Sequence, residues 1–249
     1  MPAPNDTTWA KSAQNPAIGN LQNIVRRSYR LPEASRATRK VNFRSRTSVR
    51  GIIPVWLEAQ QCARRVVFES KMELIFILVA TTSGNVVDLW EQPPAVAYYD
   101  ADGKDRRHVF DFLITMADGR RFAVAVKPQE RVFARGFAHE LGLIRRQMPV
   151  SFADDVILFT DAHYSTADAL NALRFHELSK QPDPEADQAI SSVASSLSGA
   201  LNIADLCAVT GLAGRAYRAA FRAIMTGKLK PLSSGPIQLS TIVMKGTAS

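Results

Sequence analysis

The sequence has few cysteines and no long hydrophobic run, and each of these gaps argues against a class of protein. Cys62 and Cys207 are the two cysteines among 249 residues, and neither has a second cysteine or a histidine at metal-ligand spacing. A disulfide framework and a zinc site are therefore not expected. The longest apolar run, residues 74–80, is far shorter than the roughly 20 residues that span a bilayer. The N-terminus also lacks a secretory signal pattern, so we expect a cytoplasmic protein with no membrane partner.

Acidic residues are scarce in the first fifty positions. This segment has ten lysine and arginine residues against Asp6 and Glu33, so it carries the whole net charge of +8. It is rich in Arg, Ser and Thr and poor in core-forming residues, which predicts a largely flexible basic arm over residues 1–50. Such an arm suits a nucleic-acid backbone, because each neutralised phosphate releases a counterion. A solvated tail that only keeps the protein soluble is the alternative. The expected DNA contacts in the arm are Arg36, Arg39, Lys40, Arg44, Arg46 and Arg50.

Residues 51–165 have the pattern of a mixed α/β domain. A short strand at 64–68 precedes a helical run from Ser70 that stops near 83–85. The order of the later elements predicts a mixed sheet flanked by helices. Those elements are strands over 96–99, 109–115, 122–126 and 156–160, turns at 100–105 and at Asp118-Gly119, and a helix near 138–146.

The C-terminal part predicts a second, smaller domain. Residues 166–198 are expected to form a helix and a linker, because a cap at Ser165 precedes the helix and a proline-rich break follows it. Residues 199–249 show helix, turn, helix and two short strands, which predicts a winged helix. On the second helix of this domain one face carries Arg215, Arg218 and Arg222. That face suits a DNA groove, and an ordinary solvated helix face is the alternative.

Two strands joined by a turn carry a candidate catalytic pair. Asp111 lies in the first strand and Lys127 ends the second. In an antiparallel pair of strands, the residue numbers of any two opposed residues add to the same total. A two-residue loop at Asp118-Gly119 makes that total odd, which puts Asp111 and Lys127 on opposite faces of the sheet. A three-residue loop with Gly119 in the left-handed region, followed by a bulge, puts both on one face. We therefore predict the bulged turn.

Such a pair is typical of phosphodiester hydrolysis. That reaction needs a divalent cation, which generates hydroxide at neutral pH and balances the charge that grows on the phosphate. Mg²⁺ or Mn²⁺ prefers oxygen ligands, so a second carboxylate must converge beside the lysine. Glu73, in the first turn of the expected helix, is the candidate, and Glu69 is a weaker one. Ser70 and Glu73 also form a capping-box pattern, in which Glu73 only bonds the backbone N–H of Ser70.

Three runs of sequence together resemble a known family. They are FESKMEL, DLWEQPPAVAYYDADGK and HVFDFLITMADGRRFAVAVKP, and the similarity as a whole extends over about residues 40–160. They resemble the nuclease domain of TnsA-type transposon-end endonucleases, members of the PD-(D/E)xK restriction-endonuclease-like superfamily. The resemblance implies a restriction-endonuclease-like fold followed by a winged helix. By position, it makes Glu73 and Asp111 the metal-binding carboxylates and Lys127 the catalytic lysine.

Two residues depart from the family pattern. Phe110 stands where the family usually has a proline that shapes the strand. Ala125 stands where an acid or amide helps to hold the metal, and a methyl group cannot do so. The cation would then rest on Asp111, Glu73, the backbone carbonyl of Val126, and water or phosphate oxygens, which suits Mg²⁺ because it commonly keeps several waters. Gln129 and Glu130 are downstream alternatives.

The resemblance also implies a biological role. It implies cleavage of double-stranded DNA at the 5′ ends of a transposon, beside a DDE-type transposase that cuts the other strand and an AAA+ ATPase that regulates both. Two alternatives stay open. One is a DNA-binding accessory protein that keeps the fold but has lost the metal site. The other is a winged-helix transcriptional regulator whose N-terminal domain is a sensor or dimerisation module.

Overall fold

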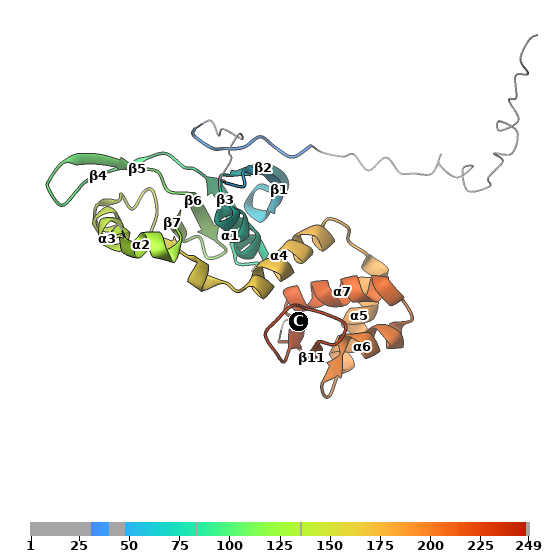
Figure 1. Ribbon diagram of the computed structural model, residues 1–249. Coiled ribbons are helices and arrows are strands. Elements are labelled where there is room, and N and C mark those ends of the chain that lie inside the picture. The colour runs from blue at the N-terminus through green and yellow to red at the C-terminus, as the bar shows by residue number, and fades with distance from the viewer. Residues whose placement is uncertain (1–30, 40–47, 83, 135, 248–249) are drawn as a thin grey trace, which may run out of the picture. The chain divides into compact units, whose positions relative to one another are not determined.

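The largest sheet in the computed structural model, which describes residues 31–39, 48–82, 84–134 and 136–247, is four-stranded and mixed (Figure 1). Its order is β3-β6-β7-β8. Strands β3 (Val86–Glu91), β6 (Phe112–Met116) and β7 (Arg121–Val126) are antiparallel neighbours, and β8 (Asp155–Phe159) pairs with β7 in parallel. The expected mixed α/β architecture is confirmed.

Two hairpins accompany this sheet. In the first, β1 (Gly51–Leu57) pairs with β2 (Cys62–Phe68), and in the second, β4 (Val96–Tyr99) pairs with β5 (Asp105–His108). The single strand expected over 109–115 is wrong in its start, because β5 ends at His108 and β6 begins only at Phe112. The sequence of β5, DRRH, is charged and largely exposed, so it has no apolar alternation that predicts a strand.

Helices cover both faces of the mixed sheet. Helix α1 (Lys71–Thr82) packs on the face formed by alternate residues of β6 and β7, where Phe76 meets Phe112. Helices α2 (Gln129–Ala134) and α3 (Phe137–Gln147) pack on the opposite face, which includes Ala123 and Ala125. Figure 1 shows α1 and α3 as separate helices beside the strands. The period-two alternation of buried side chains in β6 and β7 produces these two cores.

The turn between β6 and β7 has the predicted bulged form. The register pairs Phe112 with Val124 and Ile114 with Phe122, so opposed residue numbers add to an even total. Gly119 has a φ of 87°, in the left-handed region. The Met116 N–H donates to the carbonyl of Arg120 over 2.8 Å and closes the three-residue loop. The prediction of an even register is therefore confirmed.

Replacing Gly119 tests this turn. Gly119→Ala should lower the free energy of unfolding by about 1–2 kcal/mol, because a Cβ in the left-handed region is strained even though the space around it is open. Urea unfolding measures the change. Gly142→Ala, inside α3, is the matched control and should instead raise stability by about 0.5–1 kcal/mol. Equal effects at the two positions would contradict the proposed strain at Gly119.

A segment before β1 bonds first to the β1–β2 hairpin and then to the edge strand β3 of the mixed sheet. The N–H of Glu33 donates to the carbonyl of Ala63 on β2 over 2.8 Å. Further along, the Arg36 guanidinium donates to the carbonyl of Leu89 on β3 over 2.6 Å, and Thr38 donates through its N–H and its hydroxyl to the carbonyl of Gln92. Residues 33–39 therefore form an ordered strap, whereas the sequence predicted part of a flexible arm. Residues 1–30 and 40–47 of that arm lie outside the described part of the chain.

The C-terminal part has its own buried cluster. After α4 (Thr166–Ser179), residues 184–196, which we expected to be a linker, form helix α5 (Pro184–Ser196). Its buried Ala186, Ile190 and Ala194 recur every fourth residue and pack in this cluster. The remaining elements are β9 (Leu201–Asn202), α6 (Ile203–Thr210), α7 (Ala213–Met225), β10 (Leu229–Pro231) and β11 (Ile242–Lys245), with the strands in the order β10-β11-β9.

The described residues from Glu33 onward form one compact unit. Cys62 and Cys207 are both free thiols. In the described ranges, no helix combines the length and the apolar character needed to cross a membrane.

Candidate active site

Asp111 is fixed by its backbone in the short connection before β6. Its N–H donates to the carbonyl of Val124 over 3.0 Å, and its carbonyl accepts the N–H of Gln92 over 2.8 Å. The carboxylate Oδ2 accepts the N–H of Val126 over 2.7 Å and lies 4.0 Å from Nζ of Lys127. The structure therefore brings Asp111 and Lys127 together, as the bulged turn predicted.

Lys127 is placed by the parallel pairing of β7 and β8. Its N–H donates to the carbonyl of Phe159, the last residue of β8, over 3.0 Å. Its ammonium lies 5.7 Å from the centre of the Phe137 ring, at the start of α3. A cation over an aromatic face is attracted by the ring quadrupole, so Phe137 and Asp111 together orient the lysine.

Glu73 lies in the first turn of α1. Its Oε1 accepts the hydroxyl of Ser70 over 2.9 Å, and its N–H donates to Oγ of Ser70 over 3.1 Å. The predicted capping box is wrong in one bond, because Oε2 accepts the backbone N–H of Glu69, not that of Ser70, over 2.8 Å. Each carboxylate oxygen has further lone pairs, so capping and ligand binding are compatible.

The two carboxyl groups influence each other. Burial raises the pKa of Asp111, and the Lys127 ammonium and the Val126 N–H oppose this rise. Burial also raises the pKa of Glu73, the Glu69 N–H lowers it, and the negative charge of Asp111 raises it further. Two half-buried carboxylates that repel each other beside a lysine form a hard-oxygen donor set, which fits Mg²⁺ or Mn²⁺.

The third ligand of the family pattern has no counterpart at position 125. Ala125 is fully buried in the apolar cluster that includes Phe110 and Phe137. Gln129 and Glu130 begin α2, where Glu130 is exposed. Within residues 31–39, 48–82, 84–134 and 136–247, no three acidic, histidine or cysteine side chains lie at the spacing that holds a metal ion.

Gln92 is a residue of the site that the sequence analysis did not single out, although it lies in the second run that carries the family resemblance. It is 4% exposed and has a φ of 44°. Its N–H donates to the carbonyl of Asp111, and its side-chain amide donates to Oε2 of Glu69 over 3.0 Å. It thus ties the segment before Asp111 to the segment before Glu73. A polar residue between an apolar strand and Pro93-Pro94 was the available signal.

The basic residues expected to contact DNA divide into three groups. Arg36 forms a fork with the carboxylate of Asp88, over 3.0 and 2.8 Å, and lies over the ring of Trp90. Arg39 pairs with Glu69, and one terminal nitrogen of Arg50 lies 3.8 Å from Oε1 of Glu69, so the structure brings these two to the site. Lys40, Arg44 and Arg46 lie outside the described residues.

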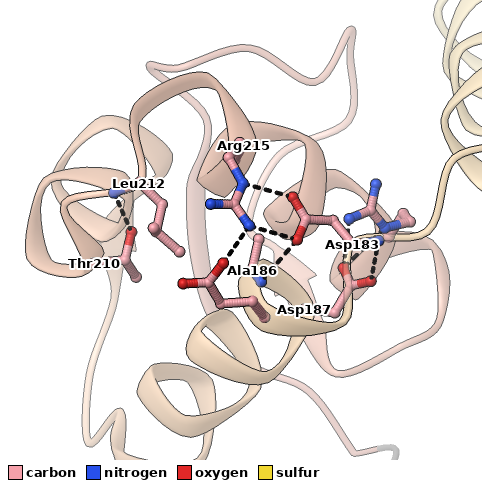
Figure 2. Close-up of polar contacts among 8 residues, drawn as sticks. Asp183, Ala186, Asp187, Thr210, Leu212 and Arg215 are labelled. Carbon is pink, nitrogen blue, oxygen red and sulfur yellow. Dashed lines mark hydrogen bonds and ion pairs between the residues drawn. The ribbon is translucent and has the colours of Figure 1, made fainter. Parts of the chain in front are cut away.

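The arginine face of α7 meets the first turn of α5. Arg215 donates to both carboxylate oxygens of Asp183 over 2.8 Å and to Glu185 over 2.5 Å, as Figure 2 shows for Asp183. This arginine lowers the pKa of Asp183 to about 2. Arg222 donates to Oδ1 of Asp187 over 2.8 and 2.6 Å, whereas Arg218 is exposed. Two of the three arginines therefore hold α5 and α7 together.

Substituting two arginines of this face tests the division of roles. Arg222→Ala should lower the free energy of unfolding by about 2 kcal/mol, because its side chain is only 11% exposed and its charged hydrogen bonds to Asp187 are lost. Arg218→Ala, on the same helix, is the matched control and should change stability by less than about 0.5 kcal/mol. Urea unfolding compares the two variants, and a larger effect at Arg218 would contradict the assignment.

The structure thus brings together Glu73, Asp111 and Lys127, and adds Glu69, Gln92 and Arg39 around them. Two acids and a lysine are residue types that metal-dependent phosphate chemistry uses. Neither the known protein-family models nor the curated proteins include a match to this chain.

Proposed function

We propose that this protein is a metal-dependent DNA endonuclease with a restriction-endonuclease-like core and a C-terminal winged helix. The observation that carries the proposal is the 4.0 Å approach of the Lys127 ammonium to the Asp111 carboxylate. Asp111 and Glu73 interact electrostatically, although they come from separate elements of the fold. An acid pair with a lysine at a strand end provides cation ligands and a positive charge for metal-dependent phosphodiester hydrolysis.

The residues would divide the chemistry as follows. Asp111 and Glu73 would hold the cation, and the backbone carbonyl of Val126 would complete the protein ligands. When bound, the cation supplies hydroxide at neutral pH and balances the charge on the phosphate. Lys127 orients the attacking water or neutralises charge in the transition state. The N–H of Val126 donates to Asp111 Oδ2 and keeps that carboxylate turned toward the site.

The positive charge near the site supports a polyanionic substrate. Arg39 and Arg50 both reach Glu69, one residue before the start of the α1 capping motif. Together with Lys40, Arg44 and Arg46 they would contact the phosphates of double-stranded DNA. Arg36 is already committed to Asp88, so in this proposal it holds the strap and leaves DNA to the other arginines.

The order of the C-terminal elements supports a winged helix. The elements follow one another in the order α5, β9, α6, α7, β10 and β11, and in this proposal α6 and α7 are the helix-turn-helix. Gly211, with a φ of 67°, lies at the turn between them. Because Arg215 and Arg222 bind α5, Arg218 is the arginine of that face available to DNA or to a protein partner.

The setting we propose is DNA transposition. The family resemblance supports cleavage at the 5′ ends of a transposon, beside a DDE-type transposase subunit and an AAA+ ATPase regulator. DNA footprints would distinguish this role from that of a winged-helix transcriptional regulator. Protection of element ends supports the endonuclease, and protection of a promoter supports the regulator.

Removing the metal tests the proposed chemistry. Duplex DNA incubated with the protein and Mg²⁺ or Mn²⁺ should acquire breaks, because the cation supplies the hydroxide. Chelation with EDTA should abolish cleavage, and excess Mn²⁺ should restore it. Gel electrophoresis of end-labelled DNA measures the breaks. Cleavage that survives EDTA would contradict a metal-dependent nuclease.

A second candidate function follows from Ala125. Its buried methyl group provides no metal ligand, which favours a DNA-binding accessory protein without nuclease activity. Mn²⁺ binding separates the two candidates. Binding to the wild-type protein that Asp111→Asn abolishes supports the endonuclease, and the absence of such binding supports the accessory protein.

A further inference from the structure

We propose that Glu69 is a third carboxylate of the cation site, occupied by Arg39 until a DNA phosphate takes that arginine away. This inference rests on the proposed function, and it names a residue that replaces the ligand missing at Ala125. It also makes DNA binding and cation binding depend on each other.

Glu69 is already tied to both acid-bearing segments. Its backbone N–H donates to Oε2 of Glu73 over 2.8 Å. Its side-chain Oε2 accepts the amide of Gln92 over 3.0 Å, and the N–H of Gln92 bonds the carbonyl of Asp111 over 2.8 Å. The negative charge of Glu69 raises the pKa of both Glu73 and Asp111, so Glu69 acts on both of the other carboxyl groups.

Gln92 gives an independent sign of a ligand. Its side-chain oxygen Oε1 is buried and finds no hydrogen-bond partner in the part of the chain that the structure describes. A buried amide oxygen without a partner is costly, so each one needs a role. The nitrogen of the same amide donates to Oε2 of Glu69, so Oε1 lies within one amide group of that carboxylate. A hard cation or one of its waters would satisfy it.

Arg39 keeps Glu69 from serving as a ligand. It forms an ion pair with Oε2 of Glu69, and Arg50 approaches Oε1 to 3.8 Å. The side chain of Arg39 is 54% exposed, whereas that of Glu69 is 16% exposed, so solvent and phosphate reach the arginine side of the pair. An exposed ion pair contributes little stability, and a guanidinium binds phosphate as well as carboxylate.

The exchange has a definite consequence for binding. Among the described residues the three carboxylates do not lie at metal-ligand spacing while Arg39 holds Glu69. When a DNA phosphate takes over Arg39, Glu69 loses this ion pair, and its side chain can turn toward Glu73 and Asp111. Cation affinity then rises in the presence of DNA, and DNA affinity rises by the same factor in the presence of the cation. The cation site is thereby completed only when DNA is bound.

Mn²⁺ binding to the full chain without DNA tests the inference. Arg39→Gln mimics the loss of Arg39 and should bind Mn²⁺ about tenfold more tightly than the wild type, within the usual range of coupling between sites. Arg39→Gln combined with Glu69→Gln should lose that gain. Arg120→Gln removes an arginine that pairs with Asp118 at the β6–β7 turn and is the matched control. It should bind Mn²⁺ as the wild type does.

The outcomes separate this inference from the proposed function. If the wild type binds Mn²⁺ and Asp111→Asn abolishes binding, but Arg39→Gln brings no gain, Glu69 is not a ligand and the endonuclease proposal stands. If neither the wild type nor Arg39→Gln binds Mn²⁺, both proposals fail. Arg39→Ala repeats the measurement, and thermal melting shows that each variant is folded. A gain that persists in the double variant also overturns the role of Glu69.

Discussion

Asp111→Asn should lower the rate of metal-dependent DNA cleavage about 10²–10³-fold while the protein stays folded. The asparagine carbonyl can still accept the N–H of Val126, which Asp111 accepts over 2.7 Å. It lacks the negative charge that holds the cation and faces the Lys127 ammonium 4.0 Å away. Single-turnover cleavage of end-labelled duplex DNA in Mg²⁺ measures the rate. A rate equal to that of the wild type would rule out Asp111 as a metal ligand.

The same substitution should stabilise the protein without metal. Burial holds the pKa of Asp111 above that of the unfolded chain, so its stabilising contribution is present at low pH and is lost as the pH rises through the folded pKa. Asp111→Asn should therefore melt above the wild type at neutral pH in EDTA, and the difference should vanish below about pH 4.

An exposed carboxylate serves as the control for this pH dependence. The N–H and guanidinium of Arg120 lower the pKa of Asp118. Asp118→Asn should therefore lower the melting temperature at neutral pH, the opposite sign. If Asp111→Asn also melts below the wild type, the Asp111 carboxylate is stabilised by its surroundings, and burial of its charge does not destabilise the fold.

Phe112→Ala should lower the free energy of unfolding by about 3–5 kcal/mol. Phe112 is fully buried, and its ring centroid lies 5.0 Å from that of Phe76 on α1 in a stacked arrangement. Truncation leaves a cavity between β6 and the helix that carries Glu73. Equilibrium urea unfolding measures the loss. Phe133→Ala, at an exposed position of α2, is the control and should cost less than about 0.5 kcal/mol.

This variant also links the core to the site. Because α1 packs through Phe76, loosening its contact with Phe112 should also move Glu73 relative to Asp111. Cleavage by Phe112→Ala, measured at a temperature where the protein is folded, should fall more than cleavage by Phe133→Ala. Equal rates in the two variants would show that α1 is positioned by other contacts.

Local sequence patterns predicted the parts of the fold that depend on neighbours in the chain. Gly119 and the spacing of Asp111 and Lys127 were enough to predict the turn and the register of β6 and β7. The cap at Ser165 marked the start of α4, where the N–H of Asp168 donates to the Ser165 hydroxyl. Each of these features is set within a few residues of sequence.

Features that depend on distant partners could not be predicted in this way. Helix α5 was not predicted. It begins at Pro184, in a stretch that was expected to be a break, and its run of apolar residues at every fourth position is short. Arg215 and Asp183 are 32 positions apart, so a surface stripe on α7 gave no sign that it binds α5. The pairing of Arg39 with Glu69 and the left-handed backbone of Gln92 are likewise products of tertiary contact.

The strap over residues 33–39 has a consequence for aggregation. Strand β3 ends the sheet order β3-β6-β7-β8, and an uncovered edge strand is a template for pairing with other chains. The Arg36 guanidinium donates a hydrogen bond to the carbonyl of Leu89 on β3, and the Thr38 hydroxyl donates one to the carbonyl of Gln92 just beyond that strand. Proteolysis that removes residues up to 32 leaves this cover in place. Proteolysis that removes residues up to 39 uncovers the edge of β3, so that β3 can pair with a strand of another molecule.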